Sequence, residues 1–114
     1  MTDKAKKPEN PVIELLVQAD EHLALGWTHY VTGEFPQALE EFHRAIESGG
    51  RVVDAHYGLG ISHRRQGETE KALDELGKAR SLVDDESIRL DPARRAILRQ
   101  LIDAQTAIFR NSDG

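Results

Sequence analysis

Residues 19–48 read ADEHLALGWTHYVTGEFPQALEEFHRAIES, and residues 53–82 read VDAHYGLGISHRRQGETEKALDELGKARSL. The two stretches align without a gap at a spacing of 34 residues and are identical at 11 of 30 positions. The identical pairs are Asp20/Asp54, His22/His56, Leu25/Leu59, Gly26/Gly60, His29/His63, Gly33/Gly67, Glu34/Glu68, Ala38/Ala72, Leu39/Leu73, Glu41/Glu75 and Ala45/Ala79. Self-similarity at a fixed period of this length indicates an internal repeat, and stacked repeats form solenoids whose surfaces bind other molecules.

The composition is that of a small, folded, non-membrane chain. It has 114 residues, of which 39% are hydrophobic and 31% charged, as in soluble globular domains. It has no cysteine, which excludes disulfides, thiolate metal sites and a cysteine nucleophile, and we expect a cytoplasmic protein. The charged N-terminus is not a secretory signal, and no apolar run of about 18 residues could span a membrane. The net charge of −5 argues against nucleic acid as the main ligand.

Each copy of the repeat predicts two antiparallel helices joined by a very short loop. Apolar residues at helical spacing predict a first helix over 12–32, which Gly33 ends in a left-handed conformation. Pro36 starts the second helix, where its missing N–H does no harm. The second copy predicts helices over about 52–66 and 70–82. The residues expected to be buried on the second helices are Ala38, Leu39, Phe42, Ala45 and Ile46, then Ala72, Leu73, Leu76, Ala79 and Val83.

A fifth helix is predicted after the repeats, with a different pattern. Asp91 caps it, Pro92 occupies its first position, and it runs to about Phe109. Arg94 stands where a third copy would place its glycine, so we do not expect a third repeat. Its main apolar stripe is Ile97, Leu101, Ala104 and Ile108, with Leu98, Ile102 and Phe109 beside it. We expect this helix to shield the open end of the stack.

Residues 19–83 resemble the tetratricopeptide repeat family. The matching residues are Leu25-Gly26, Gly33, Phe35, Ala38, Phe42 and Ala45 in the first copy, and Leu59-Gly60, Gly67, Ala72, Leu76 and Ala79 in the second. The resemblance implies an all-α, α-α superhelix, a solenoid of five helices in antiparallel hairpins. The expected segments are a flexible tail over 1–11 and a helical domain over 12–110, with repeats over about 19–50 and 53–84 and a capping helix over about 91–110.

The resemblance also indicates how the helices pack. Gly26 and Gly60 let the partner helix approach closely, and the bulky Phe42 and Leu76 fill the space between. Leu25 and His29 are expected to face the hairpin partner together with Gly26.

A second stripe on the first helix of each hairpin lines, in the family, a concave groove that holds a peptide. The candidate partner-binding residues are Leu23, Trp27, Tyr30, Tyr57, Ile61, Arg64 and Arg65. Tryptophan, tyrosine and arginine are the residues most enriched at binding hot spots, although the aromatic residues could instead pack within the fold. The Lys and Asn pair with which some relatives grip a terminal carboxylate is absent from these positions. We therefore expect an apolar peptide with an acidic group near Arg64, Arg65, Arg95 or Arg99.

The remaining chemistry-bearing residues point away from catalysis and cofactors. His22 and His29 lie seven residues apart, as do His56 and His63, which is about 10 Å along a helix and too far for one metal ion. A metal site would need one histidine from each repeat. No phosphate loop, nucleophile motif or pair of buried carboxylates is evident, and the acids Glu40, Glu41, Glu47, Asp74 and Glu75 are expected on exposed faces.

The sequence therefore predicts a non-catalytic adaptor or scaffold that binds a protein or peptide in a concave groove, without a cofactor. Two alternatives remain open. One is a self-associating module, a homo-oligomer whose groove is filled by its own chain or by a second copy. The other is a histidine-based metal binder. The sequence does not name the partner.

Overall fold

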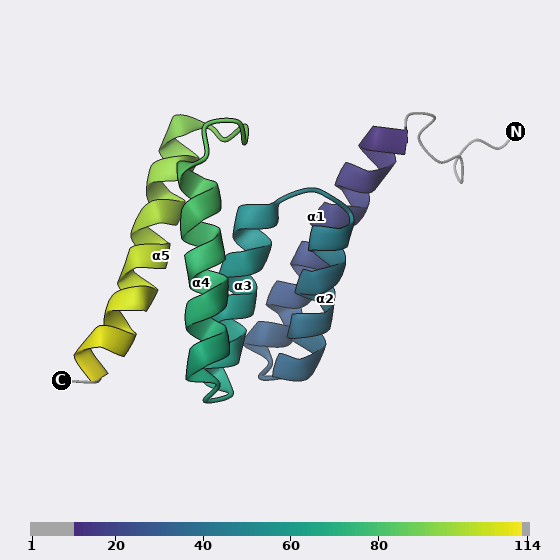
Figure 1. The fold of residues 1–114 in the computed structure, drawn as a ribbon. Helices are drawn as coiled ribbons and strands as arrows, with labels where there is room; N and C mark the ends of the chain where they lie inside the picture. Colours follow the sequence, from purple (N-terminus) through teal and green to yellow (C-terminus); the bar gives the residue numbers. More distant parts are fainter. Residues whose placement is uncertain (1–10, 113–114) are drawn as a thin grey trace, which may run out of the picture.

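The computed structural model describes residues 11–112, with side chains through residue 110, as a row of five helices (Figure 1). They are α1 (Pro11–Val31), α2 (Phe35–Glu47), α3 (Val52–Arg65), α4 (Thr69–Asp84) and α5 (Pro92–Ser112). α1 with α2 and α3 with α4 form antiparallel hairpins, α3 packs on α2, and α5 packs on α4 and touches α3. No strand occurs in the described range, so the all-α fold is as predicted. The predicted tail lies outside this range except for Pro11, which begins α1.

The turns inside the two hairpins have the predicted geometry. Gly33 and Gly67 have φ angles of +82° and +78°, the left-handed region that glycine adopts without strain. In each turn the N–H after the glycine bonds back to a histidine carbonyl, at 2.8 Å for Glu34 and 2.9 Å for Glu68. These bonds close each helix end and return the chain antiparallel to itself. The cap predicted for the fifth helix is also confirmed, because Asp91 accepts the N–H of Arg94 at 3.3 Å.

The ring of Phe42 holds the two hairpins together. A Cβ added at Gly26 of α1 would lie 2.6 Å from the ring, and one added at Gly58 of α3 would also lie 2.6 Å from it. The Phe42 ring, which belongs to α2, therefore lies against a glycine of α1 and a glycine of α3. In the second hairpin a Cβ at Gly60 would lie 2.8 Å from Leu76. The predicted close approaches at Gly26 and Gly60 are confirmed, and Gly58 adds one that the sequence reasoning missed.

Two leucines that were expected to be buried are exposed. Leu25 was expected to face α2, and Leu73 to face the core, but both side chains reach solvent. Neighbouring residues point about 100° apart around a helix. Because Gly26 and Ala72 face the neighbouring helix, the leucines beside them in the sequence point toward solvent.

The buried stripe of α5 is not the predicted one. Leu98 and Ile102 are buried, in a cluster that includes residues of α3 and α4. Ile97, Leu101 and Ile108, which were expected to form the main stripe, are 56%, 42% and 39% exposed. The helix is therefore rotated by about one residue, or 100°, from the expected orientation.

Arginines of α5 explain this rotation. Arg95 donates to the backbone carbonyl of Val83 in the last turn of α4, and Arg99 binds the carboxylate of Asp84 at 2.8 Å. The last carbonyls of a helix lack partners within the helix and carry partial negative charge, so they attract cationic donors. These bonds hold the arginine side of α5 against α4 and turn Ile97 and Leu101 away from it.

A chain of ion pairs links α1, α3 and α5. Arg51, just before α3, binds Asp20 of α1 at 3.1 Å and Asp54 of α3 at 3.3 Å. The same Asp54 accepts from Arg94 of α5 at 2.6 Å and is buried. Arg51 has a positive φ of 54°, a conformation that is unfavourable for a residue with a side chain and is held here by its two carboxylate partners.

Replacing Gly58 by alanine tests the role of the Phe42 contact. The ring also lies against Gly26, so it has little room to move away from the new methyl group. We expect Gly58→Ala to lower the free energy of unfolding by about 2 kcal/mol. Gly77→Ala is the matched control, because this helical glycine has nothing within 4 Å of its added Cβ and should gain about 1 kcal/mol from helix propensity. Thermal melts in which Gly58→Ala is as stable as the parent would contradict the packing role of the ring.

Candidate partner-binding face

An aromatic cluster occupies the junction of α1, α2 and α3. The Trp27 indole packs edge-on against Phe42, with ring centroids 4.9 Å apart, and lies 6.0 Å from Tyr30 and 6.2 Å from Tyr57. Trp27, Tyr30 and Tyr57 are half-buried, so each offers one side to the core and the other to solvent. Three of the predicted site residues are therefore brought together on one surface.

Arg65 extends this surface from α3 toward α1 and α2. Its guanidinium carbon lies 5.8 Å from the centroid of the Tyr30 ring and 5.0 Å from that of Phe35. These distances allow cation–π attraction, which holds an otherwise mobile side chain in place. Phe35 was not among the predicted site residues. An aromatic residue directly after Gly33-Glu34, at the position where the second copy has Thr69, could have indicated that Phe35 belongs to this surface.

Arg64 and Arg65 are cations without an anionic partner. No carboxylate lies within ion-pair distance of either one among the described side chains, and the half-buried Arg64 keeps its Nε without a hydrogen bond. Arg95 and Arg99, which were also expected to meet an acidic group, are instead bonded to the end of α4. Of the four arginines expected to meet an acidic group, Arg64 and Arg65 are therefore the two without a carboxylate or backbone carbonyl partner among the described residues.

The other two predicted site residues, Leu23 and Ile61, lie beneath this surface. Leu23 and Ile61 are 5% and 6% exposed, so they present almost no area to a partner. Burial raises the pKa of the Tyr57 phenol, the nearby Tyr30 adds to this, and the Arg64 charge only partly opposes it. Tyr57 therefore stays neutral at physiological pH, as a hydroxyl that can donate or accept. We call Trp27, Tyr30, Tyr57, Arg64 and Arg65 the aromatic–arginine face.

Residues 23–105 match the family model described as tetratricopeptide repeat. The chain belongs to the tetratricopeptide repeat family. The match continues beyond residue 83, where the expected resemblance ended, and includes most of α5. Comparison with curated proteins and with solved structures gave no match. Repeats of this family are in general protein-interaction modules, and they are not typically catalytic. Within residues 11–112, no helix is both long and apolar enough to cross a membrane.

Both tetratricopeptide repeats carry the same two histidine–carboxylate pairs. Between the helices of each hairpin, His22 bonds to Glu41 at 2.7 Å and His56 to Glu75 at 3.0 Å. At the turns, His29 lies 2.9 Å from Glu34 and His63 lies 2.9 Å from Glu68. The expectation that Glu41 and Glu75 lie on exposed faces is wrong, since the first is half-buried and the second buried. The sequence contained a signal for these pairs, because the histidine and the glutamate of each pair are both identical in the two copies of the repeat.

These pairs give the four histidines a structural role in the repeats. Each imidazole uses Nδ1 to reach a carboxylate, so the pairs join the helices of one hairpin or close its turn. Among the described residues, no group of three or more histidine, aspartate or glutamate side chains is arranged to hold a metal ion. The metal-binding alternative therefore has no supporting site in this part of the chain.

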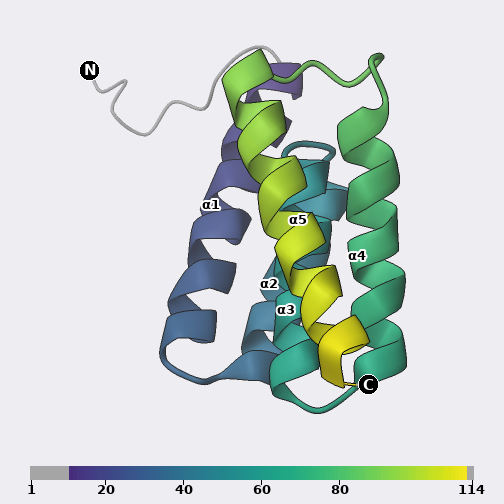
Figure 2. The same cartoon turned by 90° about the vertical axis from the view of Figure 1, so that its left-hand side faces the viewer.

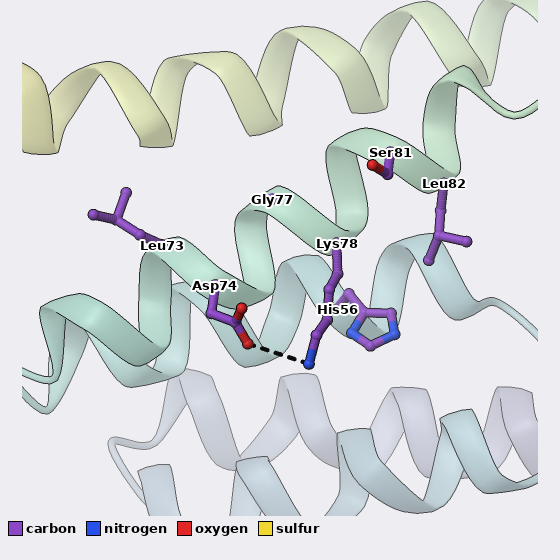
Figure 3. Close-up of a pocket in the computed structure, with 7 residues that line it drawn as sticks. All are labelled: His56, Leu73, Asp74, Gly77, Lys78, Ser81 and Leu82. Atoms are coloured by element: carbon purple, nitrogen blue, oxygen red, sulfur yellow. Dashed lines mark ion pairs between the residues drawn. The ribbon is translucent and has the colours of Figure 1, made fainter.

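A surface depression of about 550 Å³ lies on α4, apart from the aromatic–arginine face (Figure 3). Its lining residues are His56, Leu73, Asp74, Gly77, Lys78, Ser81 and Leu82. Lys78 binds Asp74 at 3.2 Å and Glu75 at 3.2 Å, while Glu75 also bonds to His56. Lys78, the cation of this depression, is paired with carboxylates, so the depression lacks the unpaired cations of the aromatic–arginine face.

The Glu75 pair predicts how stability depends on pH. Burial by itself raises the pKa of this carboxyl, but the hydrogen bonds from His56 and Lys78 outweigh it and hold the pKa below its ordinary value of 4.5. Bonds from His29 and His63 likewise lower the pKa values of Glu34 and Glu68. A carboxylate with a lowered pKa contributes stability that is complete above the ordinary value and is lost as the pH falls from there through the lowered pKa of the folded state.

We therefore expect the melting temperature of the parent chain to fall between about pH 6 and pH 3. Glu75→Gln should lower stability near neutral pH by about 1 kcal/mol and show a weaker fall in acid, because it removes one of the titrating carboxylates. Glu47→Gln is the control, since this exposed carboxylate has no ion pair among the described side chains. If Glu75→Gln keeps the pH dependence of the parent, the paired carboxylate is not a source of the acid sensitivity.

Proposed function

We propose that this chain is a non-catalytic adaptor or scaffold that binds a protein or peptide on the aromatic–arginine face. The observation that carries the proposal is the Arg64–Arg65 pair, which has no carboxylate partner on a surface that already holds three half-buried aromatic rings. Other arginines of the described chain, such as Arg44, Arg80, Arg94 and Arg99, are in ion pairs. Arg89, Arg95 and Arg110 likewise lack a carboxylate partner among the described side chains, but Arg65 also lies over aromatic rings, those of Tyr30 and Phe35.

The chemistry of this face selects the class of partner. Half-buried aromatic rings gain from contact with apolar or aromatic side chains, because they bury large area at a low entropic cost. Two unpaired guanidinium groups favour a carboxylate, which can accept two parallel hydrogen bonds from each. The net charge of the chain is −5, so an acidic partner is attracted by this local pair and not by the protein as a whole. The partner we propose is a peptide segment that places an acidic residue next to an apolar one.

The arginine pair is tested with a displayed library of random peptides, selected on the immobilised 114-residue chain. Enriched sequences should carry Asp or Glu beside an aromatic or aliphatic residue. Arg64→Ala/Arg65→Ala should weaken the selected peptide by about tenfold and reduce the dependence of its affinity on salt. Arg89→Ala/Arg110→Ala is the control with the same change in net charge, since both side chains are exposed and lie outside the face. Equal losses in the two double variants would contradict a specific site.

Trp27 is expected to be the apolar anchor of the same site. Trp27→Ala should cost about 2 kcal/mol of binding, or roughly 30-fold in the dissociation constant, measured by calorimetry with the selected peptide. The indole also packs on Phe42, so the variant should melt at a lower temperature than the parent. Binding is therefore measured well below the melting temperature of the variant. A variant with lower stability but unchanged affinity would assign Trp27 to the core alone and overturn this anchor.

A further inference from the structure

Three buried side-chain atoms have no hydrogen-bond partner among the described residues. They are Ser62 Oγ, Arg64 Nε and Gln105 Oε1. Folded proteins contain few such atoms, because a buried polar group without a partner loses the hydrogen bonds that it would make with water. The Nε of an arginine carries a hydrogen and can only donate, whereas the Oε1 of a glutamine can only accept. Arg64 and Gln105 are therefore complementary.

Gln105 of α5 lies level with Arg64 of α3. Figure 2 shows α5 in front of α3, with both helices beginning toward the top of the view and ending toward the bottom. The ion pair between Arg94 of α5 and Asp54 of α3, at 2.6 Å, fixes their register. Gln105 follows Arg94 by three turns, about 16 Å along α5 and on the same side of it. Arg64 lies about 15 Å beyond Asp54 along α3, so the two positions are at the same height.

Tyr57 lies next to both side chains. Burial, and to a lesser degree Tyr30, raises the pKa of the Tyr57 phenol, whereas the Arg64 charge and a hydrogen bond from the Gln105 amide lower it. The Gln105 amide nitrogen is thus engaged at the phenol, and its Oε1 is the atom that still lacks a partner. Arg64 Nε and Gln105 Oε1 are therefore near the same phenol, which belongs to the aromatic–arginine face.

Burial of Nε limits how Arg64 can hold a carboxylate. A carboxylate takes two parallel N–H donors of a guanidinium group, which has five. Because Nε is buried, a partner on the surface meets the two terminal nitrogens, and Nε needs an acceptor from the protein itself. Ser62 precedes Arg64 by two residues and points about 160° away around α3. Of the two buried acceptors without a partner, Gln105 Oε1 is therefore the one on the side of Arg64.

We propose that Gln105 is a positioning residue for Arg64. When an acidic peptide binds, the Nε–H of Arg64 donates to Oε1 of Gln105, and the two terminal nitrogens donate to the peptide carboxylate. Two atoms that lack partners in the free chain then gain a hydrogen bond in the complex, so α5 contributes to the preference for an acidic residue. This inference rests on the proposed function, because it concerns how the same face recognises the acid.

Calorimetry with two peptides tests this role. One is the acidic peptide selected on the chain, and the other is its copy with Asp replaced by Asn or Glu by Gln. Gln105→Leu should weaken the acidic peptide by about tenfold and leave the neutral copy nearly unchanged, because an amide gains much less from a charged donor. Gln100→Leu, at an exposed position of the same helix, is the matched control and should leave both affinities unchanged.

A second variant and a double variant separate positioning from a structural role. Gln105→Glu should weaken the acidic peptide more than Gln105→Leu does, because the new carboxylate pairs with Arg64 in the free chain and competes with the peptide. In the Arg64→Ala background, Gln105→Leu should cause no further loss, since it acts through the arginine.

Nuclear magnetic resonance of the isotope-labelled chain observes the Nε–H of Arg64 directly. The acidic peptide should move this resonance downfield in the parent, as expected for a new hydrogen bond, but not in Gln105→Leu. Equal losses on the two peptides, additive losses in the Arg64→Ala background, parent-like affinity of Gln105→Glu, or the same shift in Gln105→Leu would each overturn the positioning role and leave the proposed function standing. A chain that selects no acidic peptide would overturn both.

Discussion

The position of the Phe42 ring between Gly26 and Gly58 is the constraint on which the rest of the fold depends. The ring lies where α1, α2 and α3 meet, and a Cβ added at Gly26 or at Gly58 would lie 2.6 Å from it, so only glycine permits either approach. A contact that uses one side chain and two helix backbones fixes the distance between the hairpins and the rotation of α1 and α3 about their axes. Once those rotations are set, Leu23, Ala55 and Leu59 are directed into the same cluster. The stacking of the repeats therefore follows from one close-packed contact more than from the sum of the apolar area.

The second interface is built differently, although the repeat is the same. Leu76 replaces Phe42 and is matched by Gly60 within its own hairpin. Across the next interface, α5 contributes Leu98 and Ile102, which pack with Val53, Ala79 and Val83. Where α3 presents Gly58 to Phe42, α5 thus presents a leucine and an isoleucine to the preceding hairpin.

Most of the fold, and part of the candidate site, could be predicted from the sequence. The 34-residue period, Gly33, Gly67 and Asp91 are local signals, and each determines a backbone conformation without reference to distant residues. Rotation about a helix axis is not local. The orientation of α5 depends on bonds from Arg95 and Arg99 to the end of α4, which no periodicity reveals. For the same reason Leu23 and Ile61 share a stripe with Trp27 but lie under it. The histidine–carboxylate pairs were visible as repeated identities, yet their pairing required the antiparallel register.

The aromatic–arginine face and the core are one physical unit, because Trp27 packs directly on Phe42. The Phe42 ring that sets the distance between the hairpins therefore also determines how far the Trp27 indole extends toward solvent. A partner that immobilises Trp27 would therefore stabilise the contact between α1 and α3, and loosening of that contact would move the indole and weaken binding. Arg65 is coupled to the same region through Tyr30 and Phe35 but contributes no core volume. Charge and packing are thus separable on this face. Under the proposed function, substitution of the arginines would alter binding without changing the fold, whereas substitution of Trp27 would affect both.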